Sequence, residues 1–93
     1  MTEFTLGIDV SKATLDVALL ADGAYRSRTF TNDKDGIRRL FSFLKKAKAR
    51  GCPVVLEATG RYGDLIAHKA HERGHAVYAV SYTHLTLPTI YSV

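Results

Sequence analysis

Apolar and polar residues alternate through the beginning of the chain. The apolar positions of this segment are Phe4, Leu6, Ile8 and Val10. A period of two places successive side chains on opposite faces of a β-strand, so the pattern predicts a strand over residues 5–10. Residues 14–21 are apolar and β-branched and predict a second strand. The short turn between the two segments favours an antiparallel hairpin.

A third strand is predicted over residues 25–31, where Arg26 and Arg28 alternate with aromatic and hydroxyl side chains. It follows Asp22-Gly23, which is a strong turn dipeptide. The arginines indicate a strand that is exposed on one face. We therefore expect it near an edge of the sheet.

The segment after the third predicted strand has apolar residues at the spacing of a helix. Asn32-Asp33 supplies N-cap chemistry. The apolar positions that come after it, spaced i, i+3, i+4 and i+7, are Ile37, Leu40, Phe41 and Leu44. They predict an amphipathic helix whose apolar stripe faces the sheet. Basic residues crowd its expected last turns, where cations suit the helix dipole, and Gly51 is expected to end it.

The second half of the chain predicts a strand, a helix and a strand. Residues 53–58 are almost continuously apolar, which is typical of a strand buried on both faces in parallel pairing. A helix is expected over residues 62–73, ended by Gly74, and a fifth strand over residues 75–80. The element order is then β-β-β-α-β-α-β. It predicts an α/β fold in which a mixed sheet carries packed helices.

Composition narrows the class of protein. The 93 residues are 46% hydrophobic and 24% charged, with a formal net charge of +4. These fractions exclude a disordered chain, and no apolar run approaches the roughly 20 residues that a bilayer requires. Cys52 is the single cysteine, so no internal disulfide can form. We expect one small cytosolic domain with no membrane association.

Two acids stand out within the apolar strands. Asp9 lies in the first predicted strand and Glu57 near the end of the fourth. If these strands are adjacent and parallel, the two carboxylates converge, and a divalent cation such as Mg²⁺ or Mn²⁺ would offset their repulsion. The alternative is structural, with Asp9 capping a turn with Ser11 and Glu57 pairing with a cation such as Arg61.

Three motifs carry a family resemblance. They are Gly7-Ile8-Asp9-Val10-Ser11-Lys12, Leu15-Asp16-Val17-Ala18 and Leu56-Glu57-Ala58-Thr59-Gly60. Together they resemble the N-terminal domain of transposases of the insertion-sequence "IS one-ten" family, also called DEDD transposases or bridge-RNA-guided recombinases. The resemblance covers residues 4–80.

The resemblance implies an RNase H-like (RuvC-like) fold, here truncated after the fifth strand. It implies that Asp9 and Glu57 are catalytic residues and the first two members of a four-carboxylate site for Mg²⁺ or Mn²⁺. The chain has no acid after Glu72, so we expect an N-terminal fragment that is inactive alone. The implied partners of the full-length protein are DNA, a structured guide (bridge) RNA and further copies of itself. The implied location is the prokaryotic cytoplasm.

Basic side chains provide candidates for phosphate contacts. The candidates are Lys12, Arg26, Arg28, Lys45, Lys46 and Lys48. The alternative for the lysines near residue 45 is a solvated helix terminus, where cations are favoured in any case. Two other functions remain open. The first is the N-terminal part of a sugar kinase or actin-like ATPase, although the glycine-rich phosphate loop is missing after Asp9. The second is a free-standing RNA-binding module.

The end of the chain differs from the rest. Residues 81–93 contain no Lys, Arg, Asp or Glu, and every charged residue lies at or before Arg73. This segment resembles translated sequencing-adapter read-through. We therefore expect a partial domain over residues 1–80 and an artefactual tail over residues 81–93.

Overall fold

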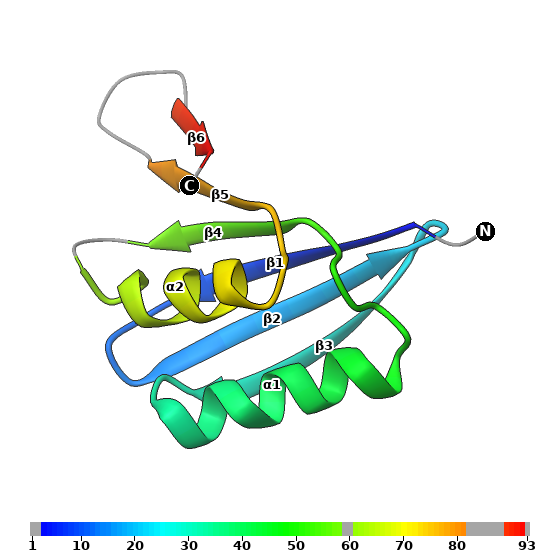
Figure 1. Ribbon diagram of the computed structural model, residues 1–93, viewed down its shortest axis with the longest axis horizontal. Coiled ribbons are helices and arrows are strands. Elements are labelled where there is room, and N and C mark those ends of the chain that lie inside the picture. Colours follow the sequence, from blue (N-terminus) through cyan, green and yellow to red (C-terminus); the bar gives the residue numbers. More distant parts are fainter. Residues whose placement is uncertain (1–2, 59–60, 82–88, 93) are drawn as a thin grey trace.

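The computed structural model describes residues 3–58, 61–81 and 89–92 (Figure 1). The strands are β1 (Phe4–Val10), β2 (Thr14–Ala21), β3 (Ala24–Thr31), β4 (Val54–Ala58), β5 (Val77–Ser81) and β6 (Thr89–Ser92). The helices are α1 (Lys34–Lys46) and α2 (Asp64–Glu72). The predicted order of three strands, helix, strand, helix and strand is confirmed, and β6 follows as an additional strand.

The sheet is mixed, with strand order β3-β2-β1-β4-β5-β6. The central strand β1 pairs antiparallel with β2 and parallel with β4. Strand β5 pairs parallel with β4 and antiparallel with β6. The predicted hairpin is confirmed, and the first and fourth strands are adjacent and parallel, which is the condition for Asp9 and Glu57 to converge. Strand β3 lies at an edge, as its arginines indicated.

Both helices pack against the same face of the sheet, in front of it in Figure 1. The core fills the space between them. Its fully buried large side chains are Leu6, Leu15, Leu40, Leu44, Val54, Ile66 and Val77. The four apolar positions predicted for α1 all belong to this core. The opposite face of the sheet is not covered by any element of the described residues.

This one-sided arrangement corrects the expected burial of β4. Val54 and Leu56 are buried beneath the helices, but Val55 is half-buried and Glu57 is exposed. The strand is therefore not buried on both faces, because both crossover helices lie on one side. Strand β3 is exposed on both faces, with only Phe30 half-buried.

Helix α1 begins as predicted and ends earlier than predicted. Asp33 is the N-cap, and its carboxylate accepts a hydrogen bond from the backbone N–H of Gly36 at 2.7 Å. The helix ends at Lys46 rather than near Gly51. Lys48 takes a positive φ of 62°, and the backbone N–H of Ala49 donates to the carbonyl of Leu44 at 2.9 Å. This is a Schellman motif, with a lysine where glycine is usual.

Lys45 and Lys46 therefore lie in the last turn of α1, whereas Lys48 and Arg50 lie beyond it. The other helix is shorter than predicted, and it is followed by Gly74 with a φ of 87°, as expected for a helix stop. No helix in residues 3–58, 61–81 and 89–92 has the length and apolar character needed to cross a membrane.

Strand β6 lies within the segment that we expected to be a tail. Its sequence, Thr-Ile-Tyr-Ser, is rich in β-branched and aromatic residues, which favour strands. It pairs with the free edge of β5, so the sheet continues one strand past the predicted end. The origin of residues 81–93 stays a prediction.

The start of α1 approaches the end of β3 so closely that only glycine fits there. A Cβ on Gly36 would overlap the carbonyl oxygen of Thr31. We predict that Gly36→Ala lowers the free energy of unfolding by about 1–3 kcal/mol, which is the usual cost of overpacking. Urea denaturation followed by circular dichroism measures this, with the exposed Ser42→Ala on the same helix as the control. Equal stability of the two variants would contradict the close approach.

Candidate functional site

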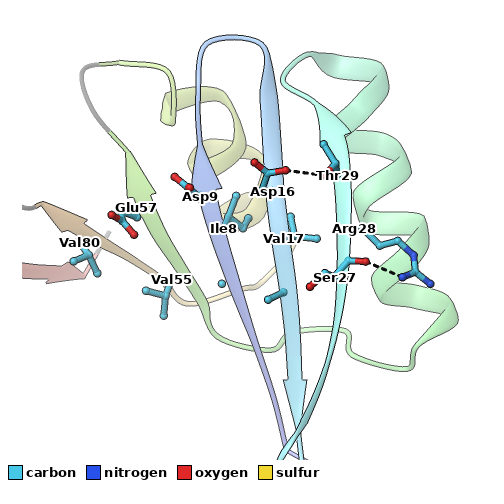
Figure 2. A pocket seen from close by; sticks show the side chains of 12 residues that line it. Ile8, Asp9, Asp16, Val17, Ser27, Arg28, Thr29, Val55, Glu57 and Val80 are labelled. Carbon is cyan, nitrogen blue, oxygen red and sulfur yellow. Dashed lines mark hydrogen bonds between the residues drawn. The ribbon is translucent and has the colours of Figure 1, made fainter.

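One row of side chains crosses the open face of the sheet at the level of the predicted acids. The backbone register pairs Asp9 with Asp16 on β2 and with Glu57 on β4. The same row continues to Thr29 on β3 and to Val80 on β5. Figure 2 shows these side chains around a hollow of about 410 Å³. Three carboxylates on three adjacent strands thus share one level of the sheet.

The predicted pair, Asp9 and Glu57, is brought together. Each is the penultimate residue of its strand, and the strands run parallel, so the two acids lie at the same end of the sheet. Alternation in each strand sends the neighbouring apolar side chains beneath the helices and the acids to the open face. Both acids are exposed, so neither carboxylate bears the cost of a buried charge.

The alternative partners considered for these acids bind elsewhere. The Ser11 hydroxyl hydrogen-bonds with Thr14, at 2.8 Å from its hydroxyl and 3.1 Å from its carbonyl. The Arg61 guanidinium lies 3.6 Å from the carboxylate of Asp64. Within the described part of the chain, neither Asp9 nor Glu57 has a cationic partner in a salt bridge.

Asp16 joins the row although the sequence did not single it out as a site residue. Its side chain accepts a hydrogen bond of 2.7 Å from the hydroxyl of Thr29, which orients it (Figure 2). Directly paired side chains on antiparallel strands have Cβ atoms about 4.5–5.5 Å apart, and like charges at that position are destabilising. The register of the short hairpin was the signal that could have found it, because pairing Val10 with Leu15 places Asp16 opposite Asp9.

Asn32 is a second residue that the sequence did not reveal as part of this region. Its side-chain amide donates hydrogen bonds of 2.8 Å to the carbonyls of Ser11 and Tyr62. Ser11 follows the strand of Asp9, and Tyr62 follows the strand of Glu57. Its backbone N–H also donates to the carbonyl of Ala13 at 2.9 Å. Asn32 therefore ties together the two loops that leave the acidic ends of β1 and β4.

The oxygen donors of this row suit a hard divalent cation such as Mg²⁺ or Mn²⁺. The described residues do not complete such a site. Within residues 3–58, 61–81 and 89–92, no three His, Cys, Asp or Glu side chains are placed so that they could hold a metal ion together. The donor chemistry thus fits the expected cation.

The basic candidates are spread over the molecule. Arg26 pairs with Leu19 and Arg28 with Val17, both of which are buried, so the arginines project on the helix side of the sheet. The guanidinium of Arg28 lies 5.3 Å from the ring centroid of Phe43 on α1 and points away from the carboxylates in Figure 2. These two arginines do not join the acidic row.

The lysines of the candidate set also lie apart. Lys12 is exposed in the turn between β1 and β2, at the acidic end of the sheet. Lys45 and Lys46 are exposed in the last turn of α1, and Lys48 is exposed just after it. Lys12 is thus the only one of these four lysines at the same end of the sheet as Asp9.

Comparison with known proteins identifies the family. A family model described as a transposase, for DEDD transposases of the IS110 type, matches residues 6–87. The chain belongs to this transposase family. The resemblance carried by the motifs around Asp9, Asp16 and Glu57 is therefore confirmed.

Curated relatives agree with the assignment to the DEDD transposases. The pilin gene-inverting protein of Moraxella bovis is 31% identical over 83 residues, which is 87% of this chain and 26% of the relative. The pilin gene-inverting protein of Moraxella lacunata is 30% identical over the same length, with the same shares of each chain. The chain thus spans about a quarter of the length of these relatives.

Solved structures confirm the expected RuvC-like fold. RuvC of T. thermophilus, in complex with a Holliday junction substrate, superimposes with a TM-score of 0.60 at 16% identity, over 85% of this chain and 64% of RuvC. YeaZ from Pseudomonas aeruginosa superimposes with a TM-score of 0.55 at 22% identity, over 85% of this chain and 44% of YeaZ. At these identities the likeness concerns the fold alone.

The pairing of Asp9 with Asp16 in the β1–β2 register provides a test of the row without any metal. We predict that Asp16→Asn raises the free energy of unfolding by about 0.2–1 kcal/mol in EDTA at low salt, because one like-charge contact is removed while the bond from Thr29 can be kept. Urea denaturation measures it, with Glu3→Gln, an exposed acid outside the row, as the control. A decrease in stability, or an equal gain in the control, would show that the two carboxylates do not repel.

The tie made by Asn32 provides a second test. We predict that Asn32→Ala lowers the free energy of unfolding by about 1–3 kcal/mol, because the carbonyls of Ser11 and Tyr62 lose their donor. Chemical denaturation checks the value, and Lys34→Ala at the exposed start of α1 should change it by less than about 0.5 kcal/mol. Hydrogen exchange of the β1–β2 turn should also become faster only in the Asn32 variant.

Proposed function

We propose that this chain is the metal-binding N-terminal part of a transposase or recombinase that acts on DNA. The observation that carries the proposal is the direct pairing of Asp9 with Glu57 on the exposed face of the sheet, in a chain of the DEDD transposase family. Exposed carboxylates on rigid adjacent strands can bind a cation while leaving room for a substrate. The name of the pilin gene-inverting relatives and the Holliday junction bound to RuvC support DNA as the substrate.

In this proposal Asp9 and Glu57 hold Mg²⁺ or Mn²⁺ through their oxygens. Such an ion, when bound, activates a water or hydroxyl and stabilises the leaving oxygen in phosphodiester chemistry. The protein's own contribution is positional. The β1–β4 pairing fixes the separation of the two carboxylates, Thr29 orients the neighbouring Asp16, and Asn32 restrains the loops that follow both strands.

We further propose that residues 1–80 are only part of the catalytic domain. Two carboxylates do not complete a cation site, and the curated relatives are about four times as long as the matched region. The missing ligands would then come from a later part of the full-length protein, which would also bind a structured guide RNA and assemble as an oligomer. On this proposal the 93-residue chain does not cleave DNA by itself, and Mg²⁺-dependent cleavage by the purified chain would refute it.

Metal titration tests the central proposal. We predict that Mn²⁺ binds the 93-residue chain, and that Asp9→Asn and Glu57→Gln each weaken binding at least about tenfold, as loss of a group in a metal site does. Isothermal titration calorimetry measures the affinity, and Asp22→Asn is the control that removes an exposed carboxylate elsewhere. Equal weakening by the control, or none by the two site variants, would refute the assignment.

The same substitutions in a full-length family member separate catalysis from binding. Recombination between two marked DNA sites should be lost in Asp9→Asn and Glu57→Gln, while DNA binding in gel-shift assays is retained. Loss of both properties together would instead indicate a role in folding or in DNA binding.

A further inference from the structure

A second hollow lies on the helix side of the sheet, away from the carboxylate row. Its volume is about 520 Å³. The side chains that carry its charge and shape come from the outer surface of α1 and from the segments that lead into β4 and β5. They are Arg38, Phe41, Lys45, Arg50, Arg73 and His75.

The lining is strongly cationic and contains no carboxylate. Arg38 forms an ion pair with Asp35 on the same helix. Lys45, Arg50 and Arg73 make no salt bridge within the described residues. All four cations are exposed, and the charges of Lys45, Arg50 and Arg73 are therefore available to a ligand from solvent.

One of these cations is held in place by aromatic contacts. The guanidinium of Arg73 lies 4.4 Å from the ring centroid of Phe41, within the range of a cation–π contact. The Phe41 ring lies 5.7 Å from the ring of His75, which is buried and hydrogen-bonds through Nδ1 with the carbonyl of Cys52 at 2.7 Å. Stacking on its flat face leaves the in-plane N–H groups of Arg73 available to an anion, and it reduces the entropy lost on binding.

This hollow is separate from the proposed metal site. Arg50 precedes β4, whereas Glu57 lies near the end of that strand. Val54 and Glu57 are three residues apart along the strand, which at about 3.3 Å per residue separates the two ends of β4 by roughly 10 Å. The hollow also lies on the other face of the sheet, which is the face that the helices cover.

Helix capping alone does not account for this group of charges. Cations are favoured at helix C-termini, and this explains Lys45 and Arg73. It does not explain Arg38, which lies in the second turn of α1, or Arg50, which lies in a loop. Four cations around an apolar floor match an extended polyanion, since guanidinium groups bind phosphate oxygens through two parallel hydrogen bonds.

We propose that this hollow binds the phosphodiester backbone of a nucleic acid, at a point remote from the carboxylates. The chemistry of the contact is the same for DNA and for RNA, because it involves phosphate oxygens and no bases. The inference does not rest on the proposed metal function. It extends the basic candidates to Arg38, Arg50 and Arg73, and it excludes Lys46 and Lys48, which do not line the hollow.

Binding to short duplexes tests the proposal. The fluorescence anisotropy of labelled 20-base-pair RNA and DNA duplexes is measured against the 93-residue chain at several salt concentrations. EDTA is present throughout, so that the carboxylate row cannot contribute through a metal. The double variant Lys45→Gln/Arg50→Gln is compared with the matched control Lys46→Gln/Lys48→Gln, which removes the same charge outside the hollow. Circular dichroism verifies that both variants are folded.

The expected result is a loss of affinity in the hollow variant alone. The slope of log affinity against log salt should become shallower by about 1.8 in this variant, because each of the two lost phosphate contacts to a duplex contributes roughly 0.9. A larger effect with one duplex than with the other identifies that nucleic acid as the ligand. Equal weakening by the control would show that the loss of net charge alone explains the weaker binding, and it would overturn the proposal. Binding of inorganic phosphate without binding of either duplex would also overturn it.

Discussion

The parallel pairing of β1 with β4 determines where the two candidate acids of this domain lie. Leu6 and Ile8 face the buried residues Val54 and Leu56 across this pairing, and the core beneath the helices depends on all four. Because side chains alternate along a strand, the same register sends Asp9 and Glu57 together to the opposite face. A slip of one residue would bury a carboxylate and expose core side chains. The stability of the core and the geometry of the acidic pair are therefore consequences of one constraint.

The one-sided packing also separates the charges of the molecule. The acidic row occupies the open face of the sheet, whereas Arg26 and Arg28 and the cations of the second hollow lie on the helix side. The helices also carry acids, namely Asp35, Asp64 and Glu72, and these pair with neighbouring basic side chains. Among the described residues, Asp9 and Glu57 differ from them because they make no salt bridge.

Most of the fold could be predicted from the sequence because its signals are local. The alternation around Ile8, the i, i+3, i+4 spacing of Ile37 and Leu40, and the turn at Gly23 all depend on neighbours in the chain. The helix between β4 and β5 also indicated their parallel pairing, but the adjacency of β1 and β4 did not follow from the sequence, because α1 connects β4 to β3 and not to β1. The predicted position of the end of α1 was wrong because a lysine, Lys48, takes the left-handed conformation that glycine usually takes.

The parts that could not be predicted depend on contacts between distant segments. The burial of β4 was overestimated because an apolar run does not reveal that both helices lie on one side. Asp16 required the register of the hairpin, and Asn32 required the positions of Ser11 and Tyr62, which are 21 and 30 residues away. The grouping of Arg38, Arg50 and Arg73 around one hollow likewise arises only when the helices have packed.

The bonds made by Asn32 also bear on how the acidic pair would respond to a cation. Its amide donates to the carbonyls of Ser11 after β1 and Tyr62 after β4, and these bonds restrain the two segments relative to each other. Binding of an ion costs conformational entropy when the side chains that hold it become ordered. Much of this cost would already be met during folding, because the two segments are restrained before any ion binds. The domain would meet a metal with its first two ligands already aligned, and only the groups supplied from elsewhere would still have to be ordered.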